Sequence, residues 1–431
     1  MRVSLTGSIQ SSIGTGLTRK SYPLIATSMG HFLNDGMFFL VPVIVDLIAT
    51  ARDIDATLIT ISLVLYYVST AISANLFGRI IDKRHLQSLG MILGIAVMST
   101  GMLLFSIALN HYMVSYFLII SSIITGIGAS FYHPTGTAIL QSYYKGNKLG
   151  RYLGINGSAG SLGRAIFPSL LLAVGIVLVS SSSSAVFFGI LGLAVSSVMF
   201  LFIREYMDKE KLERPPKKTQ IAKPLSDENS PASSKSAVGR GIILLAIISL
   251  IRNISFFSVV AWIPEYLSFV RGYGASLSLG MTMTLMFSGG IIGQLIIGLL
   301  VENHDKRKIL ITTTVLSVVL MILYLFSNGT ESLMALAAFG FFNFSGFPIF
   351  MSMIADYVPR GSTTVSNAIV WNLGGTTGQA VGPLIIGVII AGTYSRLPYA
   401  FEIMLALGLF TALIVLALPK PAKEVKAPLF A

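Results

Sequence analysis

The sequence predicts an all-α polytopic membrane protein in which twelve transmembrane helices form two six-helix bundles related by a pseudo-twofold axis. Three observations lead to this prediction. Of the 431 residues, 54% are hydrophobic and 11% are charged, whereas a soluble domain carries about 25% charged residues. Apolar runs of about 20 residues, the length that crosses a bilayer as a helix, recur along the whole chain. Short motifs of the first half also return in the second half.

The first half holds six of these apolar runs. Each is too long and too continuous for a barrel strand, so each is predicted as a helix that satisfies its own backbone hydrogen bonds in lipid. The predicted spans are 22–49, 55–81, 88–109, 113–143, 152–178 and 185–205.

A polar segment over 206–238 then interrupts the apolar pattern. It is rich in lysine and proline, which predicts a cytoplasmic linker without a packed core. The six spans predicted after it are 239–269, 275–301, 309–327, 330–357, 362–392 and 397–418. The predicted domains are therefore an N-terminal bundle (1–205), the linker (206–238) and a C-terminal bundle (239–431).

The net charge of +12 is explained by where the basic residues lie. If both termini are cytoplasmic, the cytoplasmic loops hold most of the lysine and arginine residues, and the external loops hold only Arg52, Arg271 and Arg396. This bias follows the positive-inside rule and predicts a multi-pass protein of the cell membrane with cytoplasmic termini. The charge requires no nucleic-acid partner.

One motif stands in the fifth span and again in the eleventh, 215 residues later. Glycine, alanine and proline keep the same spacing in both copies, and small residues allow close helix packing. We therefore expect helix-packing faces at both places. The copies are Gly160-Ser-Leu-Gly163-Arg-Ala-Ile-Phe-Pro168 and Gly375-Thr-Thr-Gly378-Gln-Ala-Val-Gly-Pro383.

Two further motif pairs follow the same order with offsets of 218 and 220 residues. Asn34-Asp35 followed by Phe38-Phe39 matches Arg252-Asn253 followed by Phe256-Phe257. Gly78-Arg-Ile-Ile-Asp82-Lys83-Arg84 matches Gly298-Leu-Leu-Val-Glu302 with its following Asp305-Lys306-Arg307. Repeated halves are the way many transporters build a mid-membrane site between two bodies that rock.

At these residues the chain resembles the major facilitator superfamily. The loop from Gly78 to Arg84 is similar to the signature G-x-x-x-D-R-x-G-R-R between the second and third spans, although no glycine follows the basic pair. The motif from Gly160 to Pro168 resembles the glycine/proline motif of antiporters, with Phe167 in place of the usual glycine. Gly30-His31-Phe32-Leu33-Asn34-Asp35 and Phe131-Tyr132-His133-Pro134 resemble the fosmidomycin-resistance group of drug/proton antiporters.

The resemblance implies a gate at the cytoplasmic end of the spans. A carboxylate there pairs with basic residues or a helix N-terminus when that side closes. A charge cluster that only sets the topology would explain the same residues. The gating residues implied are Gly78, Asp82, Arg84, Glu302, Asp305 and Arg307.

Three ionisable residues lie deep in the predicted spans: Asp35, Arg164 and Arg252. Each is about twelve residues from a helix end, which is about 18 Å and close to the midplane. An ionisable group at that depth costs several kcal/mol unless it is paired or faces water, so each is a functional candidate. Asp46 and Glu265 lie near the outer ends of their spans and are expected to be solvated ends or gate partners.

Asp35 is the first candidate for the proton carrier, with His31 and His133 as alternatives, because imidazole titrates near neutral pH. The two buried arginines could hold an anionic group through bidentate hydrogen bonds. A purely structural Asp–Arg pair is the alternative. We expect a central cavity, and the residues predicted to bind substrate in it are Asn34, Phe38, His133, Arg164, Arg252, Asn253, Trp371 and Asn372.

The function predicted from these features is a proton-coupled secondary transporter that exports a small amphipathic or anionic compound by alternating access. A proton symporter that imports an organic anion, either a carboxylate or a phosphate ester, fits the same residues. A membrane enzyme or a receptor would need a catalytic constellation or a large soluble domain, and the sequence offers neither.

The chemistry of other protein classes is missing from the sequence. It contains no cysteine, no phosphate-binding G-x-x-x-x-G-K-[ST] loop and no H-E-x-x-H zinc motif. We therefore expect neither a cofactor nor a metal. The expected partners are a small-molecule substrate, protons and the lipid bilayer, and the expected state is a monomer.

Overall fold

The computed structural model describes residues 21–110, 113–144, 147–212, 232–357, 366 and 369–419. All regular elements among these residues are helices, and together they make twelve spans that are long and apolar enough to cross a membrane. The predicted all-α fold with twelve transmembrane helices is therefore confirmed. Residues 1–20, 420–431 and the part of the predicted linker from 213 to 231 lie outside the described residues.

The N-terminal half builds its six spans from seven helices, because the fourth span is divided in two. At the division the amides of Ser130 and Phe131 bond to carbonyls three residues back instead of four, which tightens the turn. The helices are α1 (Tyr22–Arg52), α2 (Ala56–Arg84), α3 (Gln87–Asn110), α4 (Val114–Ala129), α5 (Tyr132–Tyr143), α6 (Asn147–Val177) and α7 (Ser181–Leu212).

The C-terminal half follows the same plan but includes π-helical turns in its seventh and eleventh spans. The seventh span consists of α8 (Ala232–Arg252), η2 (Asn253–Phe257), α9 (Ser258–Glu265) and η3 (Tyr266–Val270). The remaining elements are α10 (Leu277–Asn303), α11 (Lys306–Phe326), α12 (Gly329–Phe344), α13 (Gly346–Tyr357), η4 (Ile369–Thr376), α15 (Thr377–Ile390), η5 (Tyr394–Arg396) and α16 (Leu397–Val415).

The internal repeat is visible in the backbone as well as in the motifs. The division between α12 and α13 falls at Ser345, which lies 215 residues after Ser130. The glycine motifs also pack alike. A Cβ at Gly163 of α6 would lie 2.0 Å from the Phe32 carbonyl oxygen of α1, and one at Gly378 of α15 would lie 2.7 Å from the Leu250 carbonyl oxygen of α8. The fifth span therefore packs on the first as the eleventh packs on the seventh.

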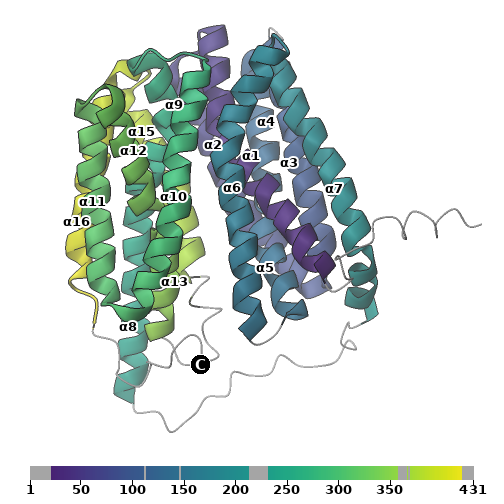
Figure 1. Ribbon diagram of the computed structural model, residues 1–431, viewed down its shortest axis with the longest axis vertical. Coiled ribbons are helices and arrows are strands. Elements are labelled where there is room, and N and C mark those ends of the chain that lie inside the picture. The colour runs from purple at the N-terminus through teal and green to yellow at the C-terminus, as the bar shows by residue number, and fades with distance from the viewer. Residues whose placement is uncertain are drawn as a thin grey trace, which may run out of the picture.

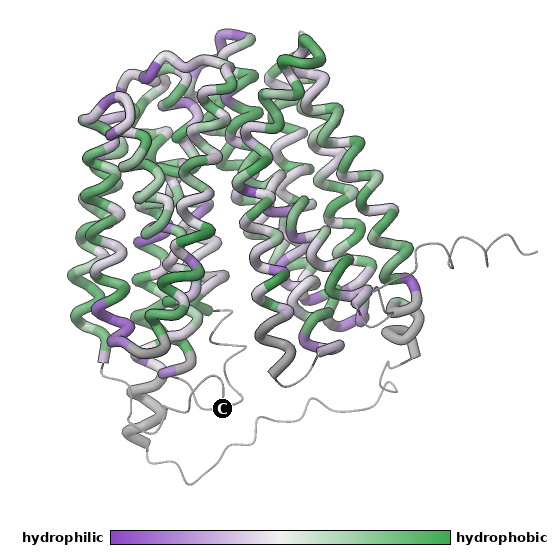
Figure 2. The backbone as a smooth tube through the Cα atoms, viewed as in Figure 1, coloured by the Kyte–Doolittle hydropathy of each residue, from purple (hydrophilic) through white to green (hydrophobic). Residues whose placement is uncertain are grey.

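The two bundles stand side by side and approach each other at one end, while their ribbons diverge toward the other (Figure 1). Along the spans the surface is apolar, and hydrophilic residues gather at helix ends and at a few interior points (Figure 2). Contacts between α1 and α9, α2 and α15, and α6 and α10 join the halves.

We call the end where the halves meet the closed end. There the Tyr394 hydroxyl donates to the Ile54 carbonyl (3.0 Å) and the Ser268 hydroxyl donates to Asp46 (2.5 Å). The opposite end, which carries Lys83, Arg84, Lys306 and Arg307, is the basic end.

Nearer the basic end the interface opens. A Cβ at Gly78 or at Gly157 would have no neighbouring atom within 4 Å. Gly78, one of the residues implied to gate, therefore makes no close contact with a neighbouring helix in this conformation.

Candidate functional site

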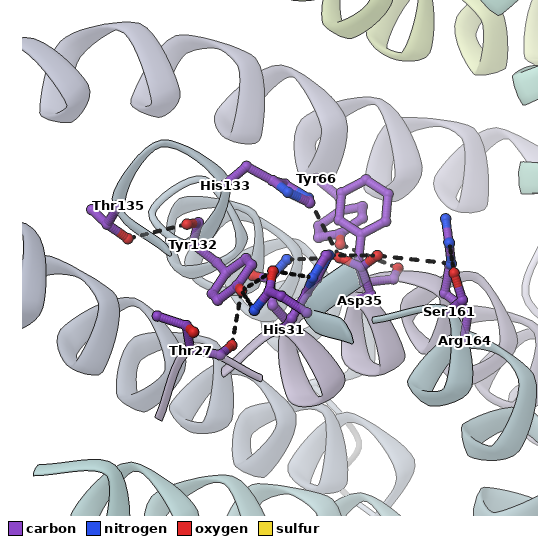
Figure 3. Close-up of polar contacts among 12 residues, drawn as sticks. Thr27, His31, Asp35, Tyr66, Tyr132, His133, Thr135, Ser161 and Arg164 are labelled. Carbon is purple, nitrogen blue, oxygen red and sulfur yellow. Dashed lines mark hydrogen bonds and ion pairs between the residues drawn. The ribbon is translucent and has the colours of Figure 1, made fainter. Parts of the chain in front are cut away.

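Asp35 is the centre of a polar cluster inside the N-terminal half (Figure 3). Its side chain is 8% exposed, and the carboxylate faces His31 one helical turn earlier on α1. His31 Nε2 lies 3.3 Å from Asp35 Oδ2, and Asn34 Nδ2 donates to Asp35 Oδ1 at 3.3 Å. The spacing on α1 therefore brings His31, Asn34 and Asp35 together.

His133 approaches the same carboxylate from α5. Because the fourth span restarts at Tyr132, His133 sits in the first turn of α5, and its Nε2 lies 3.4 Å from Asp35 Oδ1. The His133 side chain is 59% exposed. It therefore links a buried carboxylate to the accessible side of the bundle.

Arg164 of α6 is the third partner of Asp35. Its Nε lies 3.7 Å from Asp35 Oδ2, and the Nη2 group donates to the Ser161 hydroxyl at 2.6 Å. The guanidinium also lies over the rings of Phe39 (5.7 Å) and Phe344 (5.8 Å). Because Phe344 belongs to α12, Arg164 contacts both halves.

A polar path extends this contact between the halves. The Ser161 hydroxyl donates to Gln294 Oε1 of α10 at 3.3 Å, and Gln294 Nε2 donates to the Phe344 carbonyl at 3.3 Å. A movement of the Arg164 side chain would therefore alter hydrogen bonds that involve Gln294 of the C-terminal half.

The second nitrogen of His31 is held by residues that sequence reasoning missed as functional. Nδ1 lies 3.0 Å from Asn156 Oδ1, with the amide orientation assigned so that Nδ2 donates to the Tyr132 hydroxyl at 2.9 Å. Tyr132 in turn donates to the Thr27 carbonyl at 2.8 Å, and its ring stacks on His31 with centroids 4.7 Å apart. A signal was present, because Asn156 is a polar amide inside a predicted span, one helical turn before Gly160.

His31 thus lies between two oxygen atoms that can accept hydrogen bonds. One ring nitrogen faces an amide carbonyl oxygen and the other faces a carboxylate. These two contacts fix the orientation of the imidazole ring beside Asp35.

Three side chains of this cluster have the donor atoms that metal sites use. His31, Asp35 and His133 offer ligand atoms that all lie within 4.8 Å of one another, and histidine with carboxylate suits zinc and related ions. The Arg164 side chain, however, places a positive charge 3.7 Å from the carboxylate. That charge opposes a divalent cation, so a proton fits this site better than a metal ion.

Arg252 is a buried arginine of the C-terminal half, and its surroundings differ from those of Arg164. Its residue surface is 6% exposed, one Nη2 group donates to the Asn343 carbonyl at 2.9 Å, and the guanidinium lies 5.2 Å from the Phe256 ring centroid. The Nε group has no hydrogen-bond partner. Within the described residues no carboxylate lies within 4 Å of Arg252.

The other residues predicted to bind substrate have local partners. Phe38 packs among Tyr66, Tyr67 and Phe257, where the two halves meet. Asn253 Nδ2 donates to the Ser249 carbonyl of its own span at 2.8 Å, and the half-buried Trp371 ring meets Phe347 edge to face at 5.0 Å. The side chain of Asn372 lies outside the described residues.

The residues predicted to gate lie at the basic end. Asp305 caps α11 by accepting the Arg307 amide (3.0 Å), and Arg307 Nη1 donates to the Leu418 carbonyl (3.2 Å). Arg84 is exposed, and the side chains of Asp82 and Glu302 lie outside the described residues. The gate therefore stays a prediction for a conformation in which this end is closed.

Comparisons with known proteins agree with the fold. The sequence profile of the Major Facilitator Superfamily matches residues 27–376 and 275–431. An uncharacterized protein of Archaeoglobus fulgidus is 26% identical over 182 residues, which is 42% of this chain and 79% of that protein.

Two solved structures are similar in fold. Both are crystal structures of a bacterial homolog to the human lysosomal transporter Spinster, in inward-facing conformations. The unoccupied form has a TM-score of 0.65 and the occupied form 0.63, each at 13% identity over 94% of this chain and 96% of that chain.

Proposed function

The chain belongs to the Major Facilitator Superfamily and is a membrane transporter rather than an enzyme, and on this premise we propose that it couples proton movement to the export of a small amphipathic or anionic compound by alternating access. We further propose that the basic end faces the cytoplasm of a cell membrane and that both termini lie there. In this orientation the structure is a state whose outer end is sealed. The transporter works as a monomer, because each chain carries both halves.

The observation that carries the proposal is the set of partners around Asp35. A buried carboxylate within 3.7 Å of two imidazoles and one guanidinium has several ways to gain or lose a proton without leaving an unpaired charge. His133, which is largely exposed, supplies the route between Asp35 and water. When Asp35 binds a proton it loses its negative charge, and its electrostatic attraction to Arg164 weakens.

Arg164 and Arg252 are the proposed anchors for an anionic group. Arg164 becomes available when Asp35 is protonated. Among the described residues, the buried Arg252 has no partner for its Nε and no carboxylate within 4 Å. An anion at either guanidinium gains charge-assisted hydrogen bonds. The aromatic rings of Phe38, Phe39 and Phe344 between the halves give the site an apolar part, which suits an amphipathic compound.

The remaining roles follow from this scheme. Substrate also meets Asn34, His133, Asn253, Trp371 and Asn372. When substrate has bound from the cytoplasm, the basic end closes through the loop signature and its repeat, which replace the open interface at Gly78 with ion pairs. The residues proposed for this second gate are Gly78, Asp82, Arg84, Glu302, Asp305 and Arg307.

Substrate-induced proton flux in proteoliposomes tests the proposal. Vesicles containing the purified chain and a pH-sensitive dye are challenged with a panel of carboxylates, phosphonates and phosphate esters. Proton movement opposite to substrate movement supports exchange and hence export. Protons moving with the substrate would instead make the chain a symporter. Counterflow of a labelled substrate without any proton movement would contradict proton coupling altogether.

A further inference from the structure

Two carboxyl groups lie sealed between the halves at the closed end. Asp46 belongs to α1, and Glu265 ends α9 of the opposite half. The sequence suggested solvated ends or gate partners, but both residues are 0% exposed, so the first of these interpretations is wrong. Their depth along a helix could not show that the second half covers them.

The two groups are close but poorly satisfied. Ser268 lies three residues after Glu265 and donates its hydroxyl to Asp46 Oδ2 at 2.5 Å, so Asp46 contacts the helix that carries Glu265. The carboxyls are near enough for their charges to repel. Asp46 Oδ1 and both oxygens of Glu265 have no hydrogen-bond partner.

No positive charge of the described chain compensates the pair. Neither carboxyl has a lysine, arginine or histidine nitrogen within 4 Å among the residues that the structure places. Arg52 donates to the Leu109 carbonyl, Arg271 donates to Tyr266 (3.1 Å) and Asn328 (2.7 Å), and Arg396 is exposed.

The titratable groups that face the pair from other elements are acidic or neutral, so they do not offset its negative charge. Tyr67 of α2 lies near Glu265, and Tyr394 of η5 lies near both carboxyls with its hydroxyl bonded to the Ile54 carbonyl. The acidic neighbours of Tyr394 in the loop after α1 are Asp53 and Asp55.

Two ionised carboxylates in this environment are strongly disfavoured. An unpaired buried charge costs several kcal/mol, and two like charges in one site cannot both persist. A proton on one carboxyl removes one charge and supplies a donor for an oxygen that has none. The closed arrangement therefore requires a proton that the separated, hydrated carboxyls would not hold.

We propose that Asp46 and Glu265 form a second proton-binding site, built by both halves, which takes up at least one proton when the closed end seals and releases it when the halves part there. The inference rests on the alternating access of the proposed function but not on Asp35. Its ligand is a proton from the side that the closed end faces.

The pH should shift the balance between the sealed and the open state of the closed end, because the two states bind different numbers of protons. Because the sealed state binds more protons than the open state, raising the pH favours opening. One proton of difference changes the ratio of open to sealed molecules by about tenfold per pH unit, in the range where the open state is deprotonated.

Distance measurements between spin labels test the proposal on the full chain. The sequence has no cysteine, so Thr50→Cys on α1 and Thr330→Cys on α12, both exposed residues near the closed end, give a single labelled pair. Double electron–electron resonance in nanodiscs between about pH 5 and about pH 9 should show a growing population at longer distance as the pH rises. A distribution that ignores pH would overturn the proposal.

Variants of the same labelled chain identify the groups responsible. Asp46→Asn with Glu265→Gln mimics the protonated pair and should keep the end sealed at every pH. If this double variant does not fold, Glu265→Gln alone must reduce the pH response to support the proposal. An unchanged response in a folded variant contradicts it, and so does a shift produced by sodium at constant pH.

An Asp35→Asn background separates this inference from the proposed function. The closed end should still respond to pH there, because its own carboxyls remain. A response that disappears with Asp35 assigns the effect to the central site and overturns the inference. Conversely, a chain without substrate-coupled proton flux can still show the response at the closed end.

Discussion

The two halves of the molecule share a backbone plan but differ in how they treat buried charge. In the N-terminal half Asp35 is surrounded by His31, His133 and Arg164. In the C-terminal half Arg252 is buried without a carboxylate among the described residues. The buried charge of one half therefore has ionisable partners, whereas the buried guanidinium of the other half has no acidic partner among the residues that the structure places.

Equivalent positions of the repeat show which residues differ between the halves. Gly163 and Gly378 occupy equivalent places, yet the next residue is Arg164 in one half and Gln379 in the other. Asn34 corresponds to Arg252, and Asp35 corresponds to Asn253. Packing residues are thus kept where the backbone requires them, and ionisable residues occupy non-equivalent positions. The two halves therefore share their packing, and the proton and substrate roles proposed above depend on the positions at which they differ.

The largest expected effect comes from removing the carboxylate of the N-terminal cluster. Asp35→Asn keeps the shape of the side chain but cannot ionise, so proton-driven accumulation of substrate should be abolished while exchange of bound substrate continues. Accumulation under an imposed pH gradient and counterflow in the same vesicles measure the two processes. Glu331→Gln, an exposed acid at the start of α12, is the control and should keep both. Normal accumulation by the Asp35 variant would contradict the proposal that Asp35 carries the coupled proton.

Arg252→Ala tests the other side of the comparison. Loss of a charge-assisted hydrogen bond to an anion costs about 1.5–3 kcal/mol, which weakens binding by about 10–100-fold. Proton flux should persist at saturating substrate, because Asp35 is untouched. Isothermal titration with the best anion of the panel measures the affinity. Lys306→Ala at the basic end is the control, and an equal loss there would show that Arg252 does not contact substrate.

A pair of glycine substitutions tests whether packing is truly shared. An added methyl at Gly163 or Gly378 meets a carbonyl oxygen of the neighbouring helix, so Gly163→Ala and Gly378→Ala should each destabilise the protein by about 1–3 kcal/mol. The shorter distance at Gly163 predicts the larger loss. Thermal unfolding in detergent measures both, with Gly157→Ala as the control because its Cβ meets no neighbour. A loss in only one half would break the packing symmetry.

The sequence predicted the fold well because the bilayer leaves few choices. Span length, charge placement and motif repeats act along the chain, and they located the helices and the mid-membrane charges. The His31–Asp35 contact followed from one helical turn. Contacts between distant elements were less accessible: nothing in the spacing showed that Arg164 rather than Arg252 meets Asp35, or that Asp46 is covered by the second half. Asn156 was missed because a polar amide inside a predicted span does not reveal its partner.

The smallest expected effect concerns that residue, which positions His31 without carrying a proton itself. Asn156→Ala removes the oxygen that faces His31 Nδ1, so the ring loses one hydrogen bond of about 1 kcal/mol and is held less firmly beside Asp35. Proton-coupled transport should therefore slow by at most about fivefold, which is the ratio that 1 kcal/mol gives. Initial rates of transport under an imposed pH gradient measure the effect. Asn156→Asp keeps an oxygen acceptor at the same place and should recover most of the rate. If both variants are slowed equally, Asn156 supports the fold around Tyr132 and does not act by positioning His31.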